Sequence, residues 1–206
     1  MVYPDRAAAG RALATALEHL RPTRPLVLGL PRGGVPVAAA VSTAIGGELD
    51  VLLVRKLGLP WQPELAMGAL GESGLVVLNR DVVDHSGVSA EAFDEVERAE
   101  RAELRRRQAV LRVGEPIPLA RRTVVLVDDG IATGATVVAA CRVARAQRPD
   151  RLVVAAPVSS PEAARRVERE CDEFVCLWTP ADLGGVGMAY SDFHQLGDDE
   201  VIALLR

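Results

Sequence analysis

The chain has 206 residues, a hydrophobic content of 49% and a formal net charge of −4 at pH 7. This length suits one α/β domain with elaborations or at most two small domains. The negative charge argues against a general nucleic-acid binder, and no apolar run approaches the roughly 20 residues of a membrane span. Cys141, Cys171 and Cys176 fit no common zinc spacing and indicate buried thiols in a reducing, cytoplasmic setting.

The N-terminal part of the chain predicts a helix followed by a strand–loop–helix unit. Residues 5–20 have helical spacing, and Arg6 interrupts this Ala-rich stretch, so no secretory signal is expected. Residues 25–30 read as a buried strand and residues 35–45 as a helix. The glycine-rich loop between them, residues 31–34, precedes a helix N-terminus and is suited to an anion. An ordinary turn is the alternative.

Residues 50–54 read as the next strand, which would end in the cations Arg55 and Lys56. Ligands of open α/β sheets bind beyond the carboxyl ends of strands. Residues 58–62 form a predicted loop, and Glu64 is interpreted either as a residue near the site or as a helix N-terminal charge. Residues 69–72 and 75–79 have the pattern of a hairpin.

A long helix is predicted over residues 89–112, opened by Ser89 and running from acidic to basic along its length. Its sparse apolar residues favour a solvated helix with one thin buried stripe; a lid or a homodimer contact is the alternative.

The organising stretch of the chain is residues 121–136, RRTVVLVDDGIATGAT. Residues 123–127 are apolar without alternation, which is typical of a strand buried on both faces of a parallel sheet. Asp128 and Asp129 follow directly, then a Gly/Thr loop and a helix-forming run over residues 137–146. Adjacent carboxylates are costly to bury unless a metal or a hydroxyl-bearing ligand meets them. The pattern therefore suits a ligand with a diol and a phosphate, such as a sugar phosphate; a plain strand–helix turn is the alternative.

The segment VVLVDDGIATGAT resembles the phosphoribosyl-diphosphate (PRPP) motif of type I phosphoribosyltransferases. The resemblance implies a parallel-sheet α/β fold flanked by helices, with a small hood and an inserted hairpin and long helix. It implies one domain over residues 1–206, with a core at about residues 20–160 and hood elements from residues 174–196. Predicted strands at 151–155 and 173–178, a helix at 161–170 and a closing helix at 198–206 fit this layout.

The resemblance also implies the activity, which is transfer of the 5-phosphoribosyl group of PRPP to a nitrogen acceptor with release of diphosphate. Asp128 and Asp129 would hold the ribose hydroxyls directly or through Mg²⁺, and with Lys56 they are the catalytic candidates. The 5′-phosphate would bind Ala132, Thr133, Gly134, Ala135 and Thr136. The diphosphate would bind Arg32, Gly33, Gly34 and Lys56, in a loop that often contains a non-proline cis peptide in the family.

The acceptor is not specified by these residues. The nucleobase would lie under the hood, where Trp178, Tyr190 and Phe193 could stack on it, although each is also a plausible core residue. Family members acting on 6-oxopurines commonly carry an acid at the position of Ala132, so that acceptor class is disfavoured. Alternative readings are a non-catalytic PRPP- or nucleotide-binding regulatory protein and, from the VDD sequence alone, a phosphate-transfer receiver domain.

Overall fold

The computed structural model describes residues 2–206, and its centre is a five-stranded sheet of order β2-β1-β6-β7-β8. All neighbouring strands run parallel. The strands are β1 (Leu26–Gly29), β2 (Glu48–Val51), β6 (Thr123–Val127), β7 (Arg151–Val158) and β8 (Glu173–Trp178). This confirms the expected parallel α/β fold, with the central strand β6 at its expected bounds.

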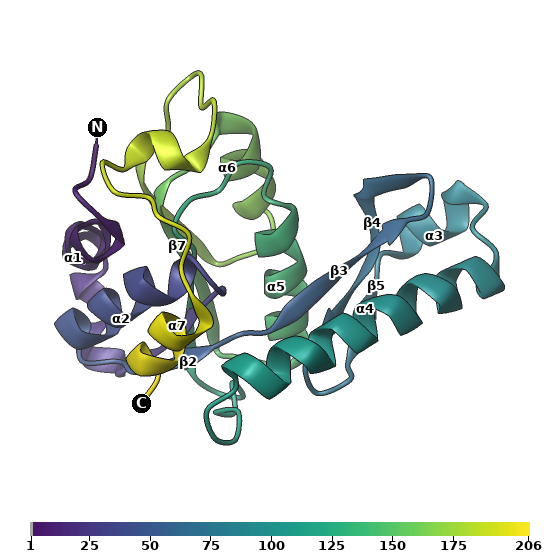
Figure 1. Cartoon of the computed structure of the whole chain (residues 1–206), viewed down its shortest axis with the longest axis horizontal. Coiled ribbons are helices and arrows are strands. Elements are labelled where there is room, and N and C mark those ends of the chain that lie inside the picture. Colours follow the sequence, from purple (N-terminus) through teal and green to yellow (C-terminus); the bar gives the residue numbers. More distant parts are fainter. Residues whose placement is uncertain (1) are drawn as a thin grey trace.

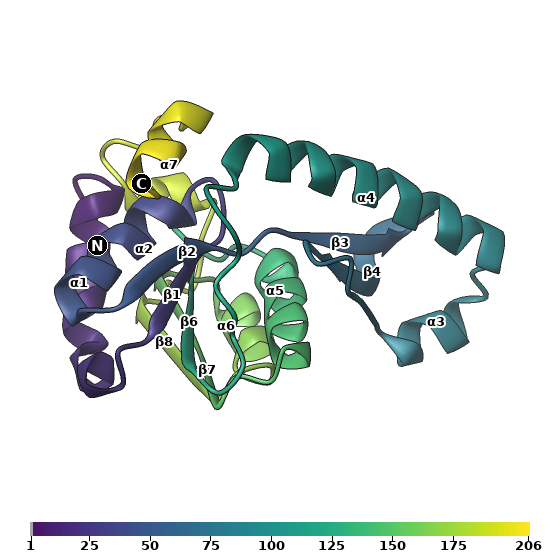
Figure 2. The same cartoon turned by 90° about the horizontal axis from the view of Figure 1, so that it is seen from below.

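Helices cover both faces of this sheet (Figures 1 and 2). On one face lie α1 (Arg6–Ala16) and α2 (Gly34–Ile45), and on the other lie α5 (Ala135–Ala146) and α6 (Pro161–Val167). An apolar core lies on each face of the sheet, and alternate residues of β6 point into one or the other. Val125 and Val127 pack with α1 and α2, whereas Val124 and Leu126 pack with α5 and α6. Burial on both faces is why β6 is apolar without alternation.

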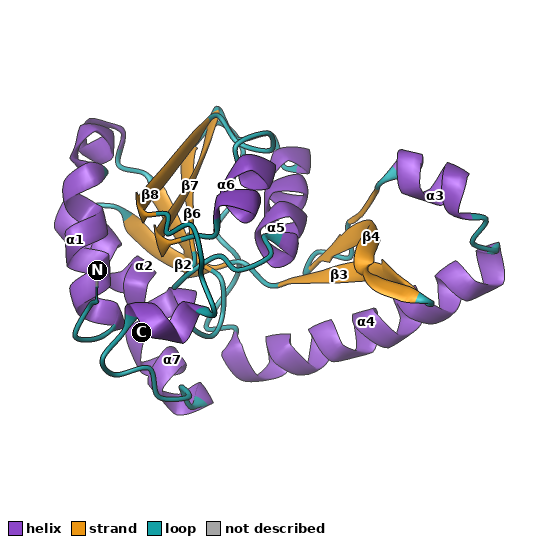
Figure 3. Cartoon of the chain, turned by 90° about the horizontal axis from the view of Figure 1, so that it is seen from above, coloured by secondary structure: helices purple, strands orange, loops and turns teal. Residues whose placement is uncertain are grey.

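An arm projects from the core between β2 and β6 (Figures 1 and 3). It consists of a three-stranded antiparallel sheet, β3 (Val54–Leu59), β4 (Gln62–Gly71) and β5 (Val76–Leu78), with α3 (Arg80–Ser86) and α4 (Ala90–Leu111). Ser89 caps α4 by accepting a hydrogen bond from the Ala92 amide at 3.2 Å. Only Leu104 and Leu111 of α4 are buried, which agrees with the predicted thin stripe. Across residues 2–206, no helix combines the length and the apolar character needed to cross a membrane.

The predicted strand over residues 50–54 and the predicted loop that follows it are wrong in position. The second parallel strand ends at Val51, and Arg55 and Lys56 lie inside β3 of the arm. Glu64 belongs to β4, so its interpretation as a helix N-terminal charge is also wrong. The chain crosses between the two sheets through Leu52 and Leu53, which are 3% and 2% exposed. Because the crossing is buried and apolar, its sequence reads as one continuous strand.

The base of the arm is fixed to the core by Arg112, just after α4. Its guanidinium forms ion pairs with Asp50 of β2 and with Glu72 after β4, both at 2.5 Å, and donates to the Val51 carbonyl at 2.9 Å. All three side chains are at most 11% exposed. Burial raises the pKa of Glu72 although Arg112 opposes the shift. One guanidinium therefore joins the parallel sheet, the antiparallel sheet and the end of α4.

The C-terminal segment returns across the carboxyl ends of the strands. It contains a short 3-10 helix over Val186–Ala189 and ends in α7 (Asp198–Leu204), which contacts both α2 and α4. Tyr3 forms a parallel bridge with Tyr190, so the two terminal segments of the chain meet beside the sheet.

Candidate active site

The central motif forms a cavity of about 200 Å³ at the end of β6. The loop that follows the two acids is held by β7 and α6: the Ile131 amide donates to the Val158 carbonyl at 2.9 Å, and Ser160 Oγ donates to the Ala132 carbonyl at 2.7 Å. Gly134 has a φ of +79°, a left-handed conformation that glycine adopts without strain. The cavity is lined by Asp128, Gly130, Ile131, Ala132, Thr133, Gly134, Ala135, Thr136, Val137 and Val186. All five residues predicted to bind the 5′-phosphate therefore share one cavity with Asp128.

Asp128 lies at the wall of this cavity with no cation paired to it among residues 2–206. Its Oδ1 accepts the amide N–H of Asp129 at 3.0 Å. Enclosure by protein, and secondly the negative charge of Asp129, raises the pKa of Asp128 to about 8. An uncompensated carboxylate facing a cavity is suited to a cation or to hydroxyl groups of a ligand.

Asp129 has a different environment, because Arg6 of α1 is its partner. Arg6 Nε lies 2.8 Å from Asp129 Oδ2, and these side chains are 9% and 13% exposed. Arg6 also donates to the His194 carbonyl at 3.0 Å and lies 4.0 Å from the ring centre of Phe193. The Tyr190 hydroxyl donates to the Asp129 carbonyl at 2.5 Å. Burial raises the pKa of Asp129, and Arg6 opposes that shift. Asp129 thus joins α1, the central motif and the C-terminal segment.

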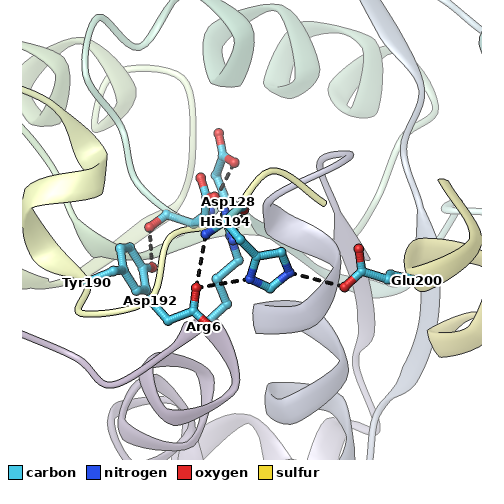
Figure 4. A network of polar contacts seen from close by, with 7 residues as sticks. Arg6, Asp128, Tyr190, Asp192, His194 and Glu200 are labelled. Atoms are coloured by element: carbon cyan, nitrogen blue, oxygen red, sulfur yellow. Dashed lines mark hydrogen bonds and ion pairs between the residues drawn. The ribbon is translucent and has the colours of Figure 1, made fainter. Parts of the chain in front are cut away.

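A second polar network supports the same segment. The His194 ring lies 3.0 Å from Asp192 and 3.1 Å from Glu200 of α7 (Figure 4). These two carboxylates raise the pKa of His194, the hydrogen bond with Asp192 having the larger effect. The hood and α7 are therefore held together beside Arg6.

The loop after β1 lies against the acids. The Pro31–Arg32 peptide bond is cis. A Cβ atom on Gly33 would overlap the Asp129 carboxylate, and one on Gly34 would overlap the Val127 carbonyl oxygen, so both positions require glycine for close approach. Arg32 lines a cavity with Asp198, and its Nη1 lies 3.7 Å from Asp198 Oδ1. The structure thus brings the two glycine-containing loops predicted from the sequence into direct contact.

Lys56 lies over a larger cavity of about 530 Å³ that also reaches Pro31 and Thr136. Lys56 Nζ is 3.2 Å from Glu64, whose side chain is 75% exposed. Arg55 lines the same cavity but is held at 2.5 Å by the half-buried Glu100 of α4. The Lys56–Glu64 pair is longer than the Arg55–Glu100 pair and its carboxylate is largely exposed, so Lys56 is the more available of the two cations for a ligand.

Two residues of the site were not predicted from the sequence. Arg107 of α4 lines the cavity of Lys56 and, with Arg32 and Arg106, an adjoining cavity of about 260 Å³. The sequence feature that could have identified Arg107 is the run of three arginines, but this run was interpreted only as the basic end of a helix. Arg6 carried no usable signal, since its partner Asp129 lies 123 residues away along the chain.

The three aromatic candidates for a base pocket have unequal exposure. Tyr190 is 6% exposed and packs with Tyr3 at a ring-centre distance of 5.9 Å. Trp178 is half-buried in β8 and packs in the same cluster. Phe193 is 38% exposed, stacks on Tyr190 at 5.1 Å and keeps an open surface. Tyr190 and Trp178 therefore act in packing here, and Phe193 is the candidate that a ligand can reach.

Comparison with known proteins agrees with this fold. Residues 4–191 match the model of the phosphoribosyl transferase domain family. The chain belongs to this family. It is 52% identical over 205 residues to "Putative phosphoribosyl transferase Rv0571c" of Mycobacterium tuberculosis, of which the match covers 46%. The chain thus spans about half the length of the curated relatives that it matches. The crystal structure of TT1426 from Thermus thermophilus superposes with a TM-score of 0.92 at 43% identity, covering 100% of this chain and 98% of that one.

Proposed function

We propose that this domain transfers the 5-phosphoribosyl group of PRPP to a nitrogen acceptor and releases diphosphate. The observation that carries the proposal is that all five predicted phosphate-loop residues line one cavity with Asp128, beside the Pro31–Gly34 loop and the cavity of Lys56. A phosphate at one end, a diol near the acid and a diphosphate over the cations match the order of these groups in PRPP.

The residues have distinct roles in this proposal. The small loop over residues 132–136 binds the 5′-phosphate through its amides and hydroxyls. Asp128 accepts hydrogen bonds from the ribose hydroxyls, and Asp129, held by Arg6, positions the loop around Gly33. Lys56, Arg32 and Arg107 attract and neutralise the diphosphate. Catalysis would then rest on placement of the reactants and on stabilising the negative charge of the departing group.

Magnesium fits this site as a companion of the substrate. Among residues 2–206, no group of three or more His, Cys, Asp or Glu side chains could hold a metal by itself. Mg²⁺ is commonly bound by one or two carboxylates together with substrate phosphates. Asp128 would hold it directly, and Asp129, whose Oδ2 is paired with Arg6, would contribute indirectly. The ion would supply further charge neutralisation at the diphosphate.

The acceptor is proposed as a nucleobase or related amine, with 6-oxopurines disfavoured because Ala132 has no group that exchanges a proton. A cytoplasmic location is part of the proposal, supported by the three free cysteines. A homodimer through the arm stays a prediction.

The test is calorimetric titration with PRPP with and without Mg²⁺, followed by a panel of nucleobases assayed for diphosphate release. The Lys56→Ala variant should lower PRPP affinity, whereas Arg80→Ala, an exposed cation on α3, should not. PRPP binding with release on one acceptor supports the transferase. Binding with no release across the panel favours a regulatory PRPP-binding protein, and the absence of binding contradicts the proposal.

A further inference from the structure

A separate cavity of about 330 Å³ lies between β4 of the arm, α5 and the end of α6. The residues of α5 that line it, Ala135, Val138, Ala139 and Arg142, are three and four positions apart and so share one helix face. That face is turned toward the antiparallel sheet, which α5 contacts (Figure 1). The cavity shares only Gly134 and Ala135 with the phosphate loop cavity, and it contains neither acid of the central motif.

Three guanidinium groups converge on this cavity. Arg142 pairs with Glu170 at 2.9 Å, and Arg166 pairs with Glu162 at 2.6 Å, where both side chains are more than half exposed. Arg169 donates its Nε to the Arg165 carbonyl at 2.9 Å and makes no ion pair with a carboxylate in the described chain. Guanidinium groups bind phosphate in a bidentate manner, which makes Arg169 and Arg166 available phosphate ligands.

The acidic residues of the cavity do not cancel this charge. Glu170 is already paired with Arg142, and Glu64, which lines both this cavity and that of Lys56, is paired with Lys56 at 3.2 Å. Arg169 thus keeps a positive charge that no carboxylate of the cavity pairs with, and Arg166 is paired only with the exposed Glu162 outside the cavity. This positive charge would attract an anion into the cavity.

The opposite wall of the cavity is apolar. Leu65 is 39% exposed although it is a large aliphatic residue, and Ala66, Val138 and Ala139 extend the same surface. The Asn79 side chain donates to the Ala66 carbonyl at 3.3 Å, which leaves its amide oxygen as an acceptor. Apolar walls with a few convergent polar groups are typical of small-molecule sites, and about 330 Å³ is at the small end of their range.

We propose that this cavity is a second ligand site that binds a mononucleotide, with the phosphate on Arg166 and Arg169 and the base on the Leu65–Val138 wall. The combination of guanidinium groups at one end and an apolar wall at the other matches a ligand with a phosphate and a flat ring. The residues proposed to bind the nucleotide, Arg166, Arg169 and the Leu65–Val138 wall, are not those assigned to PRPP, although Gly134 and Ala135 line both cavities.

The test is calorimetric titration of the whole chain with AMP, GMP, CMP and UMP in the absence of PRPP. The Arg169→Ala variant removes the guanidinium without breaking an ion pair, and Arg165→Ala is its control, with the same change of charge four residues earlier and outside the cavity. Thr133→Val separates this site from the central one. We expect Arg169→Ala to weaken one binding event at least tenfold, the effect of losing a charged hydrogen bond, and Arg165→Ala and Thr133→Val to leave that event unchanged.

Two results would overturn the inference. One is nucleotide binding that Thr133→Val weakens and Arg169→Ala does not, which would place all binding at the central motif. The other is no binding by any of the four nucleotides at millimolar concentration. Since PRPP is absent from the experiment, failure of the proposed transfer reaction would not change either result.

Discussion

Neutralising the two neighbouring acids of the central motif should change stability in opposite directions. Asp128→Asn removes a carboxylate that has no cation partner in the described structure, whereas Asp129→Asn removes the partner of the buried Arg6. Both substitutions keep the shape of the side chain. Comparing the two variants therefore isolates the effect of a negative charge in two different environments at adjacent positions.

The expected magnitudes follow from these environments. Breaking a buried ion pair costs about 3–5 kcal/mol because an uncompensated charge is left behind, and the Arg6 side chain is only 9% exposed. Each unit by which burial raises the pKa of Asp128 makes its ionised form in the folded protein less favourable by about 1.4 kcal/mol. Asp128→Asn should therefore stabilise the protein at pH 8 by several kcal/mol, up to about 5.

The gain in Asp128→Asn should depend on pH. The pKa of Asp128 is raised to about 8 in the folded protein and is about 3.9 in an unfolded chain. The folded state therefore holds this proton more tightly, and wild-type stability is greatest below about pH 4 and falls as the pH rises toward 8. Asparagine has no proton to lose, so the advantage of Asp128→Asn should be small at pH 4 and complete at pH 8.

The assay is urea denaturation of both variants and the wild type at pH 4 and pH 8, without PRPP or magnesium. Asp84→Asn, at an exposed position on α3, is the matched control and should stay within about 0.5 kcal/mol of the wild type. The reasoning would be refuted if Asp128→Asn lost stability at pH 8, or if both variants shifted in the same direction by similar amounts.

Three further predictions concern the cations and the phosphate loop. Arg107→Ala should weaken PRPP binding about tenfold in calorimetry through loss of a charged contact. The control Arg105→Ala, exposed on the same helix and outside the cavities, should leave the affinity for PRPP unchanged. Equal effects of the two variants would mean that Arg107 does not contact PRPP. Thr133→Val should lower affinity for ribose 5-phosphate and PRPP alike by about tenfold, and a loss for PRPP alone would mean that the 5′-phosphate binds elsewhere. Arg112→Met should lower the free energy of unfolding by about 3–5 kcal/mol, since its two carboxylate partners are buried. An unchanged urea denaturation curve would show that the ion pairs of Arg112 are not needed to hold the arm on the core.

The parts of the fold that were predicted correctly have patterns that lie within short stretches of the sequence. The strand β6 is apolar throughout because helices cover both of its faces, and that pattern is readable without any structure. The helix α4 has a serine cap that marks its start, and its acidic residues precede its basic ones, as the helix dipole favours. The central motif combines a strand end, two acids and a small-residue loop within about a dozen positions, so its cavity was predictable too.

The parts that were missed depend on contacts between distant segments or on a change of sheet. The buried crossing at Leu52 and Leu53 conceals the end of the parallel sheet, so Lys56 was placed at a strand end and not within the arm. The register of β3 on β4 shifts near Gly58, which weakens the alternation that would mark a hairpin. The role of Arg107 requires the position of α4 relative to the Pro31 loop, which no local pattern encodes.

The contrast between Asp128 and Asp129 shows how one loop can hold two adjacent acids. Two adjacent carboxylates could not both stay unpaired without a large cost in stability. Arg6 compensates one of them, and in doing so fixes α1 and the hood around the motif. The other stays uncompensated toward the cavity, where its unfavourable energy in the free protein becomes binding energy once a ligand supplies a cation or hydroxyl donors. A ligand of that kind should therefore bind more tightly as the pH rises toward 8, because the carboxylate of Asp128 must lose its proton to accept it.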